Sequence, residues 1–327
     1  MIVMINVQLR HFFILLCGFC LADRATGAPI SAKQSPQTVI IAMNEWASQR
    51  VLSKAVGTMI SGMGGQVEYQ DISVAHQWGA LRQGFVHIQV EVWQSSVNDV
   101  LMKALADNWF DDLGLHDAKG REDWWFPSYV RQLCPELPDW RALNQCVDIF
   151  SEQKRLGVGV YRTGPWNPHD ADLIRALKLQ YRIERYDDTR PLWVALKQAV
   201  EKEEPILLLN WTPNWTDVRV KGQFVEFPKY DQACELDVAW GINKQMTYDC
   251  GKPQQSQLKK VAWSGLAKHS FCAHQLVKNI QFTSDMIANA SALMVADGHD
   301  ENKAAQLWLK MYVNEAQQWI PKTCFAP

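Results

Sequence analysis

Residues 38–65, TVIIAMNEWASQRVLSKAVGTMISGMGG, decide the fold because two different hydrophobic periods meet in them. The run TVIIAM (38–43) is short, apolar and rich in β-branched residues, as is typical of a buried strand. From residue 48 to residue 65 the apolar residues recur at helical spacing, and the segment stops at glycines. This stretch therefore predicts a strand followed by a helix, the unit from which parallel sheets are built.

The same alternation of strand and helix recurs along the chain, which indicates an α/β fold with parallel sheets and right-handed crossovers. Further strands are expected at 66–72, 87–93, 156–161, 180–186 and 204–211. The helices between them are expected at 74–84, 96–108, 169–179 and 190–203. The remaining pattern predicts a strand at 236–243 and helices at 254–266, 269–296 and 301–319.

The length of 327 residues exceeds what one core usually serves, so we expect two lobes. The chain is expected to cross between them near 123–130 and again near 234–242. Lobe 1 would then comprise residues 29–125 plus 239–327, and lobe 2 residues 126–238. Two hinged α/β lobes that clamp a ligand in the cleft between them form the periplasmic-binding-protein-like architecture of exported solute-binding proteins.

The N-terminus has the layout of a secretory signal. Arg10 precedes an apolar core at 12–21, and small residues follow at 25–28. We expect residues 1–28 to be a signal peptide and the mature protein to be periplasmic; a retained membrane anchor is the alternative. Six cysteines follow the signal, and an even number in an exported chain indicates disulfides. Of the 15 possible pairings, we favour the sequential one: 134–146, 234–250 and 272–324.

Charge and motifs exclude several classes of function. A net charge of −2 argues against a nucleic-acid partner, which needs a basic surface. No GxSxG, HExxH or phosphate-binding loop occurs, so we expect no enzyme, and no metal site or cofactor.

Tryptophans point to the ligand. The chain has 15 of them, and four follow predicted parallel strands: Trp46, Trp93, Trp166 and Trp211. Ligands of open α/β sheets bind beyond the carboxyl ends of the strands, so these side chains should converge on the cleft, two from each lobe. A quaternary ammonium has no N–H to donate, and indole faces hold it by cation–π attraction. The spacing therefore predicts an aromatic cage.

Two further tryptophans are candidates near the cage. Trp215 follows Trp211 in the next loop and would line or cover the site. Trp124 lies beside Trp125 at the expected lobe crossing, where one would form a cage wall and the other pack beneath it. The helical spacing of the remaining ones indicates packing: Trp78, Trp193, Trp308 and Trp319.

Four motifs resemble the glycine betaine/proline betaine/choline-binding proteins of osmoprotectant ABC importers. They are, in order, EVWQSS (91–96), DWWFPSYV (123–130), RTGPWNPHDAD (162–172) and LLNWTPNW (208–215), within a resemblance that spans about residues 38–320. In that family three tryptophans box the trimethylammonium head group, and the motifs assign this role to Trp93, Trp166 and Trp211. The resemblance implies a partner, the membrane permease of an ABC importer.

The sequence departs from the family where the rest of the ligand would bind. Family members often carry PGWGC at the middle motif, whereas Pro168 here has no N–H to donate to a ligand carboxylate. Asn167 and His169 are the replacement candidates, although His169 as a plain surface residue is equally open. Ser48 stands where choline-selective relatives place an aspartate, which favours a betaine-like zwitterion over choline. The full set of candidate ligand-binding residues is Trp93, Trp166, Trp211, Trp46, Asn167, His169, Ser48, Asn44, Trp124 and Trp215.

The predicted function is therefore capture of a glycine betaine-like quaternary ammonium compound for an ABC importer. Choline and carnitine remain alternative ligands. A tryptophan-lined carbohydrate site is the rival class, because sugars also stack on indoles.

Overall fold

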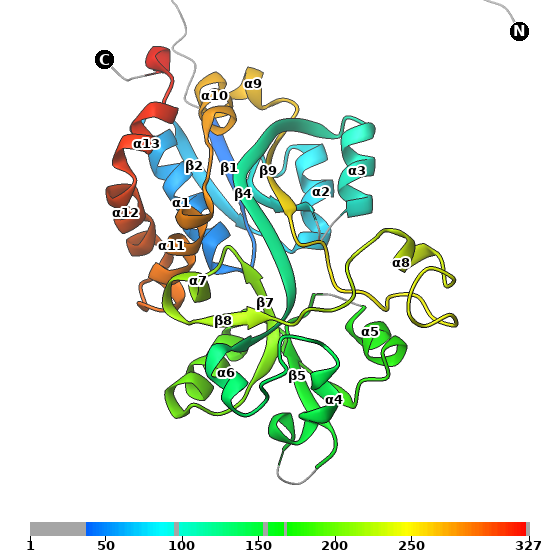
Figure 1. Ribbon diagram of the computed structural model, residues 1–327. Coiled ribbons are helices and arrows are strands. Elements are labelled where there is room, and N and C mark those ends of the chain that lie inside the picture. The colour runs from blue at the N-terminus through cyan, green and yellow to red at the C-terminus, as the bar shows by residue number, and fades with distance from the viewer. Residues whose placement is uncertain (1–36, 95–97, 153–155, 167–168, 325–327) are drawn as a thin grey trace, which may run out of the picture. The chain divides into compact units, whose positions relative to one another are not determined.

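Hydrogen-bonded strands form a continuous path through the computed structural model, in the order β2-β1-β3-β9-β4-β7-β5-β6 with β8 beside β4 (Figure 1). The structure describes residues 37–94, 98–152, 156–166 and 169–324, so the predicted signal peptide and Asn167 lie outside the described residues. The strands are β1 Thr38–Met43, β2 Gln66–Asp71, β3 Ile88–Trp93, β4 Phe110–Pro127, β5 Gly159–Thr163, β6 Tyr181–Arg185, β7 Leu207–Thr212, β8 Gly222–Phe224 and β9 Ser256–Trp263.

The predicted parallel strands are present at both ends of this path. β1 pairs in parallel with β2 and β3, and β5 pairs in parallel with β6 and β7. Of these strands, β1 and β7 contain apolar runs in the sequence, and the alternating β3 is buried at all six positions. The α/β fold predicted from the alternation is confirmed.

Antiparallel strands join the two parallel groups, which the sequence patterns did not predict. The 18-residue β4 pairs with β9 as far as Gly120↔Ser256 and with β7 from Arg121↔Thr212 onward. Figure 1 shows β4 running from one group of strands into the other. The sequence FDDLGLHDAKGREDWWFP is mostly polar in its first two thirds, so its extended state depends on its pairing with β9 and β7 rather than on its own pattern.

Two predicted elements in the last third are wrong. The expected helix at 254–266 is strand β9, whose backbone is paired on one side to β3 and on the other to β4. The expected strand at 236–243 consists mainly of turns, which follow the short helix α8 at Ala233–Leu236. The Asp237 carboxylate accepts from the N–H of Ala239, and such local side-chain bonds favour turns over strands.

In the part of the chain that the structure describes, helices cover both faces of the β1–β3 group and also pack against the β5–β7 group. They are α1 Ala47–Gly62, α2 Val74–Gln83, α3 Asn98–Ala106, α4 Ala142–Gln145, α5 Asp170–Ala176, α6 Thr189–Lys202, α7 Trp215–Arg219, α8 Ala233–Leu236, α9 Leu266–His269, α10 Phe271–Asn279, α11 Ser284–Val295, α12 Glu301–Met311 and α13 Val313–Trp319. Short 3₁₀ turns lie at Ser128–Gln132, Val147–Phe150 and Lys322–Cys324. The helix expected at 269–296 is divided at Thr283, whose hydroxyl caps α11, and that expected at 301–319 is divided at Tyr312.

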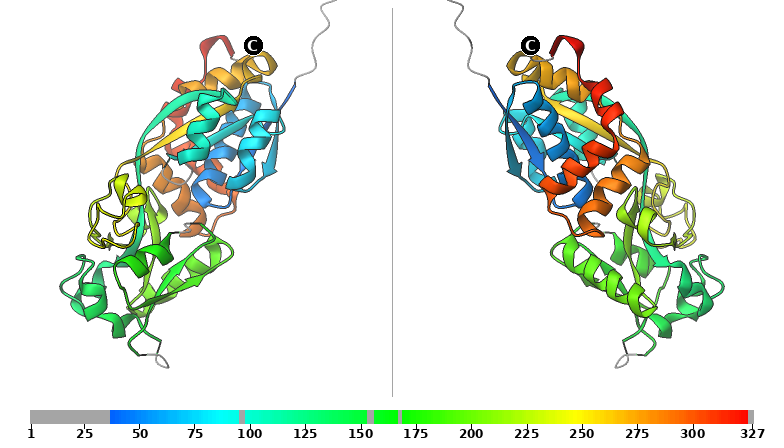
Figure 2. Two further views of the ribbon diagram at one scale, coloured as in Figure 1. Left: turned by 90° about the vertical axis from the view of Figure 1, so that its right-hand side faces the viewer. Right: turned by 90° about the vertical axis from the view of Figure 1, so that its left-hand side faces the viewer.

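The hydrophobic core is divided into separate clusters, two of which lie on opposite faces of the β1–β3 group. The largest apolar cluster contains residues of α1, β3, α6, β7 and α10–α13, and a smaller cluster packs α2 and α3 against the other face. A third cluster, around Trp124 and Tyr161, packs α4 and α5 against the neighbouring strands β4, β7 and β5. Figure 2 shows the C-terminal helices beside α1, consistent with the contacts of α11 and α12 with α1.

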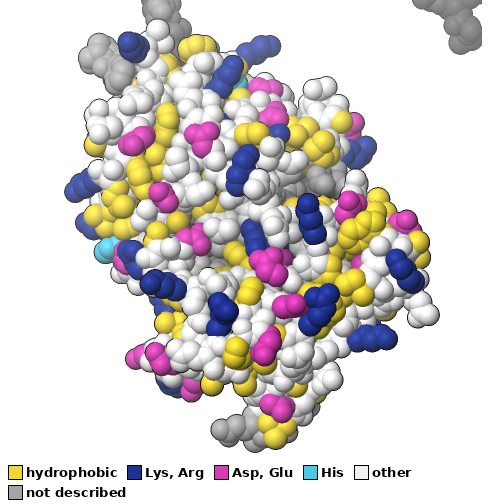
Figure 3. Space-filling model, in the orientation of Figure 1, with side chains coloured by type: hydrophobic (Ala, Val, Ile, Leu, Met, Phe, Trp, Pro, Cys, Tyr) yellow, Lys and Arg dark blue, Asp and Glu magenta, His cyan; other side chains and the backbone are white. Residues whose placement is uncertain are grey.

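Disulfides pair as the sequential order predicted: Cys134–Cys146, Cys234–Cys250 and Cys272–Cys324. The second bond closes a segment around α8 that exposes Leu236, Val238 and Ile242. On the face drawn in Figure 3, hydrophobic side chains gather on the side of α8, and acidic and basic side chains are intermingled elsewhere. Among the described residues, no helix combines the length and apolarity that crossing a membrane requires.

Candidate functional site

Strand ends place four tryptophans as the sequence predicted. Trp93 is the last residue of β3, and Trp211 is the last but one of β7. Trp46 follows β1 at the N-cap of α1, and Trp166 lies three residues beyond β5. Trp93 and Trp211 belong to the largest apolar cluster, and Trp46 and Trp166 pack against it, so one contiguous cluster contains all four.

Strand β4 lies next to both Trp93 and Trp211. The Trp93 ring lies over Gly120, because a Cβ added there would be 2.5 Å from its Cζ3 atom. Two residues further along β4, Glu122 is the register partner of Trp211. An extended strand rises about 3.4 Å per residue, so the two tryptophans meet β4 at points about 7 Å apart.

Aromatic contacts fix the orientation of Trp211. Its ring centroid lies 5.8 Å from that of Trp166, at an interplanar angle of 85°, and 5.1 Å from that of Trp193 on α6. Trp193 also meets Trp215 edge-on at 5.7 Å. Edge-to-face pairs are a favourable arrangement of aromatic rings. Trp211 is therefore held between Trp166 and Trp193, with Trp215 behind Trp193.

A buried carboxylate joins Trp46 to Trp93. Glu91 Oε1 accepts hydrogen bonds from the indole N–H of Trp46 (2.7 Å), the indole N–H of Trp93 (2.8 Å) and the hydroxyl of Ser48 (3.0 Å). Glu91 is fully buried, and its Oε2 atom has no hydrogen-bond partner among the described residues. Burial raises the pKa of Glu91 to about 7, against the opposing effect of these three hydrogen bonds.

An amide network lies next to Glu91 on the same face of β3. The Gln89 amide donates to Gln77 Oε1 and Asn44 Oδ1, and Gln49 donates to Gln89 Oε1. Asn44 also donates to the Ile72 carbonyl. The predicted site residue Asn44 is thus bonded to the protein, where it fixes the turn between β1 and α1.

The remaining predicted site residues that the structure describes make contacts of their own within the protein. Trp124 is completely buried, stacks on Tyr161 at 3.9 Å and donates its indole N–H to Asp170, so it belongs to the core of β4, β5 and β7. His169 is exposed, stacks on Tyr248 at 4.0 Å and bonds Asp172. Trp215 is buried behind Trp193.

Sequence reasoning missed Glu91 and assigned Trp193 only to packing. In an alternating strand, residues 89, 91 and 93 share one face, so the position of Glu91 beside Trp93 was available as a signal. Alternation of this kind usually indicates a solvated face, but β3 is buried on both faces.

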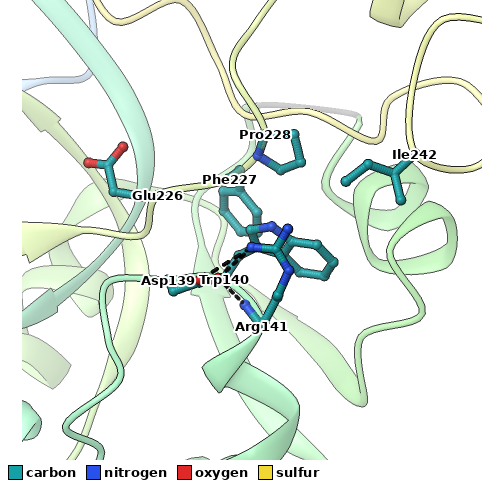
Figure 4. Close-up of a pocket in the computed structure, with 7 residues that line it drawn as sticks. All are labelled: Asp139, Trp140, Arg141, Glu226, Phe227, Pro228 and Ile242. Carbon is teal, nitrogen blue, oxygen red and sulfur yellow. Dashed lines mark hydrogen bonds and ion pairs between the residues drawn. The ribbon is translucent and has the colours of Figure 1, made fainter.

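A surface hollow of about 290 Å³ lies elsewhere, lined by Asp139, Trp140, Arg141, Glu226, Phe227, Pro228 and Ile242 (Figure 4). None of the predicted site residues that the structure describes lines it, so it is distinct from the tryptophan cluster. A group of Cys134, Glu136 and Cys146 has the spacing of metal ligands, but its two sulfurs form a disulfide and are not available to a metal.

Comparison with known proteins identifies the family of the chain. Residues 37–311 match the family described as the substrate binding domain of ABC-type glycine betaine transport systems. The trimethylamine N-oxide-binding protein of Pelagibacter ubique (strain HTCC1062) is 30% identical over 303 residues, which cover 90% of this chain and 93% of that protein. The glycine betaine/carnitine transport binding protein of Listeria monocytogenes is 23% identical over 133 residues, 40% of this chain and 37% of that protein.

Solved structures give the same fold. The glycine betaine/L-proline-binding protein of Borrelia burgdorferi matches with a TM-score of 0.65 at 17% identity, covering 89% of this chain and 100% of that one. A lactococcal protein in its closed conformation with glycine betaine matches with a TM-score of 0.64 at 15% identity, covering 87% and 100%. Both are two-lobed binding proteins, which confirms the predicted architecture.

Proposed function

The chain belongs to the family of substrate-binding domains of ABC-type glycine betaine transport systems, and we propose that it captures a small compound with a trimethylated nitrogen and delivers it to the permease of an ABC importer. Members of this family are extracytoplasmic substrate-binding proteins rather than enzymes, so the prediction of a binding protein without catalytic activity is confirmed. The finer proposal concerns the ligand and the residues that hold it.

One observation carries the proposal: Trp46, Trp93, Trp166 and Trp211 share a single cluster in which two indoles are fixed by Glu91 and two by each other. A trimethylated nitrogen offers no hydrogen-bond donor and a wide, soft positive surface. Indole faces attract such a group by about 2 kcal/mol or more per well-placed desolvated ring, and burial of its methyl groups adds to this.

A glycine betaine-like zwitterion is the first candidate ligand. Ser48, which stands where an aspartate would meet a choline hydroxyl, donates to Glu91 and places no second carboxylate beside the cage. Asn167 and His169 remain proposed partners for the ligand carboxylate. Choline and carnitine are the alternatives within the same class.

Trimethylamine N-oxide is a second candidate because the relative named for binding it is similar over 90% of this chain. It shares the trimethylated nitrogen and lacks a carboxylate, so it needs the tryptophan cage without the contacts proposed for Asn167 and His169. Substitution of His169 by Ala would therefore weaken glycine betaine binding and spare the N-oxide.

Isothermal titration calorimetry with glycine betaine, trimethylamine N-oxide, choline and carnitine tests the proposal, with maltose as the carbohydrate control. We expect saturable heat and a change in tryptophan fluorescence with at least one trimethylated compound. Heat with maltose and none with the other four would refute it in favour of a sugar site.

We further propose that the two lobes meet along β4, where pairing changes from β9 to β7 between Gly120 and Arg121. The boundaries at 125/126 and 238/239 stay predictions of the sequence, as do the signal peptide at 1–28 and periplasmic location. Limited proteolysis with and without ligand tests the lobe division, and N-terminal sequencing of the exported protein tests the cleavage site.

A further inference from the structure

We infer that Glu91 is a positioning residue of this ligand site. Its carboxylate fixes the planes of the Trp46 and Trp93 indoles. Its negative charge, next to these rings, makes the cage select a cationic head group. The inference rests on the proposed function. It adds a specificity-determining residue that does not itself belong to the aromatic walls.

Geometry carries the positioning role. Trp46 follows β1 and Trp93 ends β3, yet both indole N–H groups end on the same atom, Glu91 Oε1, at 2.7 and 2.8 Å. An indole has one N–H, and its direction lies in the ring plane, so a shared acceptor sets both planes at once. The Ser48 hydroxyl, at 3.0 Å, holds the acceptor in place. Hydrogen bonds to an ionised acceptor are about twice as strong as neutral ones.

Among the residues that the structure describes, no cationic side chain contacts the Glu91 carboxylate, and those of helix α1 pair elsewhere. The three groups that contact its carboxylate are all neutral. On α1, Arg50 pairs with Asp71 and Glu301, and Lys54 pairs with Glu301. Strand β1 carries no titratable side chain.

Strands β9 and β4 also leave Glu91 without a partner charge. The ammonium of Lys260 donates to the Leu115 carbonyl, and Lys259 pairs with Asp112. His116 on β4 is bonded through Nε2 to the Val90 carbonyl, and burial lowers its pKa to about 3, so it is neutral. Among the described residues, the ionised form of Glu91 is therefore an uncompensated buried charge, which is costly.

A cationic ligand on the Trp46 and Trp93 rings would be the missing counter-charge. Carboxylates that accept the indole N–H bonds make the ring faces more attractive to a cation, and the low dielectric of the interior leaves the charge weakly screened. Because burial raises the pKa of Glu91 to about 7, a cation should bind more tightly above pH 7 than below it, with release of a proton below pH 7.

The test compares choline with 3,3-dimethyl-1-butanol, in which carbon replaces the charged nitrogen, by calorimetry at pH 6 and pH 8. Glu91→Gln retains an acceptor oxygen for the indoles and removes the charge. We expect the variant to bind choline about tenfold more weakly at pH 8 and to lose the pH dependence, with less than a twofold change for the neutral compound. Glu45→Gln is the matched control, since Glu45 adjoins Trp46 but is exposed; it should behave as the wild type.

A second measurement needs neither variant nor ligand. Ionisation of Glu91 changes the hydrogen bonds of two indoles, so tryptophan fluorescence of the ligand-free wild type should titrate with a midpoint near pH 7. Absence of that transition, or equal choline affinity and pH profile in wild type and Glu91→Gln, overturns the inference while leaving the proposed function intact. If no trimethylated compound binds the wild type at all, the proposed function fails and this inference fails with it.

Discussion

Replacing Gly120 by alanine tests whether the Trp93 ring is a wall of the ligand site. The added Cβ would lie 2.5 Å from Cζ3 and 2.9 Å from Cε3 of Trp93, whereas carbon atoms pack at about 3.5–4.0 Å. The indole must therefore retreat by about 1 Å, which also stretches its 2.8 Å hydrogen bond to Glu91. If that displacement removes half of a cation–π contact of about 2 kcal/mol, binding weakens by about 1 kcal/mol, or roughly fivefold.

The assay is calorimetry with the tightest ligand of the screen, at a temperature well below the melting transition, since overpacking also costs about 1–3 kcal/mol of folding stability. Gly79→Ala is the control, because a Cβ at this glycine of α2 meets no atom within 4 Å. We expect wild-type affinity for the control. Wild-type affinity for Gly120→Ala as well would show that Trp93 does not line the ligand site.

Three further predictions follow from separate features. Trp211→Ala should weaken ligand binding by about 1–3 kcal/mol, measured by calorimetry, and an unchanged affinity would remove Trp211 from the site. Replacing Cys272 and Cys324 together by serine should lower the free energy of unfolding by about 4 kcal/mol, because the bond closes a loop with a sequence separation of 52; a loss below about 1 kcal/mol in urea denaturation would contradict this. Burial lowers the pKa of His116 to about 3, so its stabilising effect is complete above about pH 6.5 and declines as the pH falls toward 3. His116→Gln should therefore flatten the pH dependence of the unfolding midpoint between pH 6.5 and 4, and an unaltered slope would exclude this histidine as its cause.

The sequence predicted the parts of the fold that carry their own hydrophobic period. β1 and β7 contain apolar runs that any sheet would bury, β3 alternates apolar and polar residues, and α1 and α6 have one apolar face. The strands β4 and β9 were not recognised because their extended state depends on neighbours distant in the chain. In SQLKKVAW (256–263), Leu258, Val261 and Ala262 have the spacing of a helix face, yet pairing with β3 and β4 makes the segment a strand.

The candidate site divides in the same way. The positions of Trp93 and Trp211 could be predicted because a tryptophan at a strand end has a geometric consequence. The burial of Glu91 could not be predicted, since a glutamate in an alternating strand ordinarily faces solvent, and only the assembled fold shows its carboxylate bonded to two indoles. Trp124 was a candidate by its place at the lobe crossing, but its side chain points into the core around Tyr161.

The strand β4 has a consequence for engineering the protein. It carries Gly120 beneath Trp93 and Glu122 opposite Trp211, and it is also the strand in which sheet pairing changes partner. We therefore expect strong epistasis between substitutions that stiffen this strand and substitutions that resize the ligand site. The effect of a double mutant on ligand binding should differ from the sum of the two single effects. A directed-evolution campaign for new ligands would need to vary β4 together with the tryptophans. Libraries confined to the tryptophans would leave the distance between Trp93 and Trp211 unchanged.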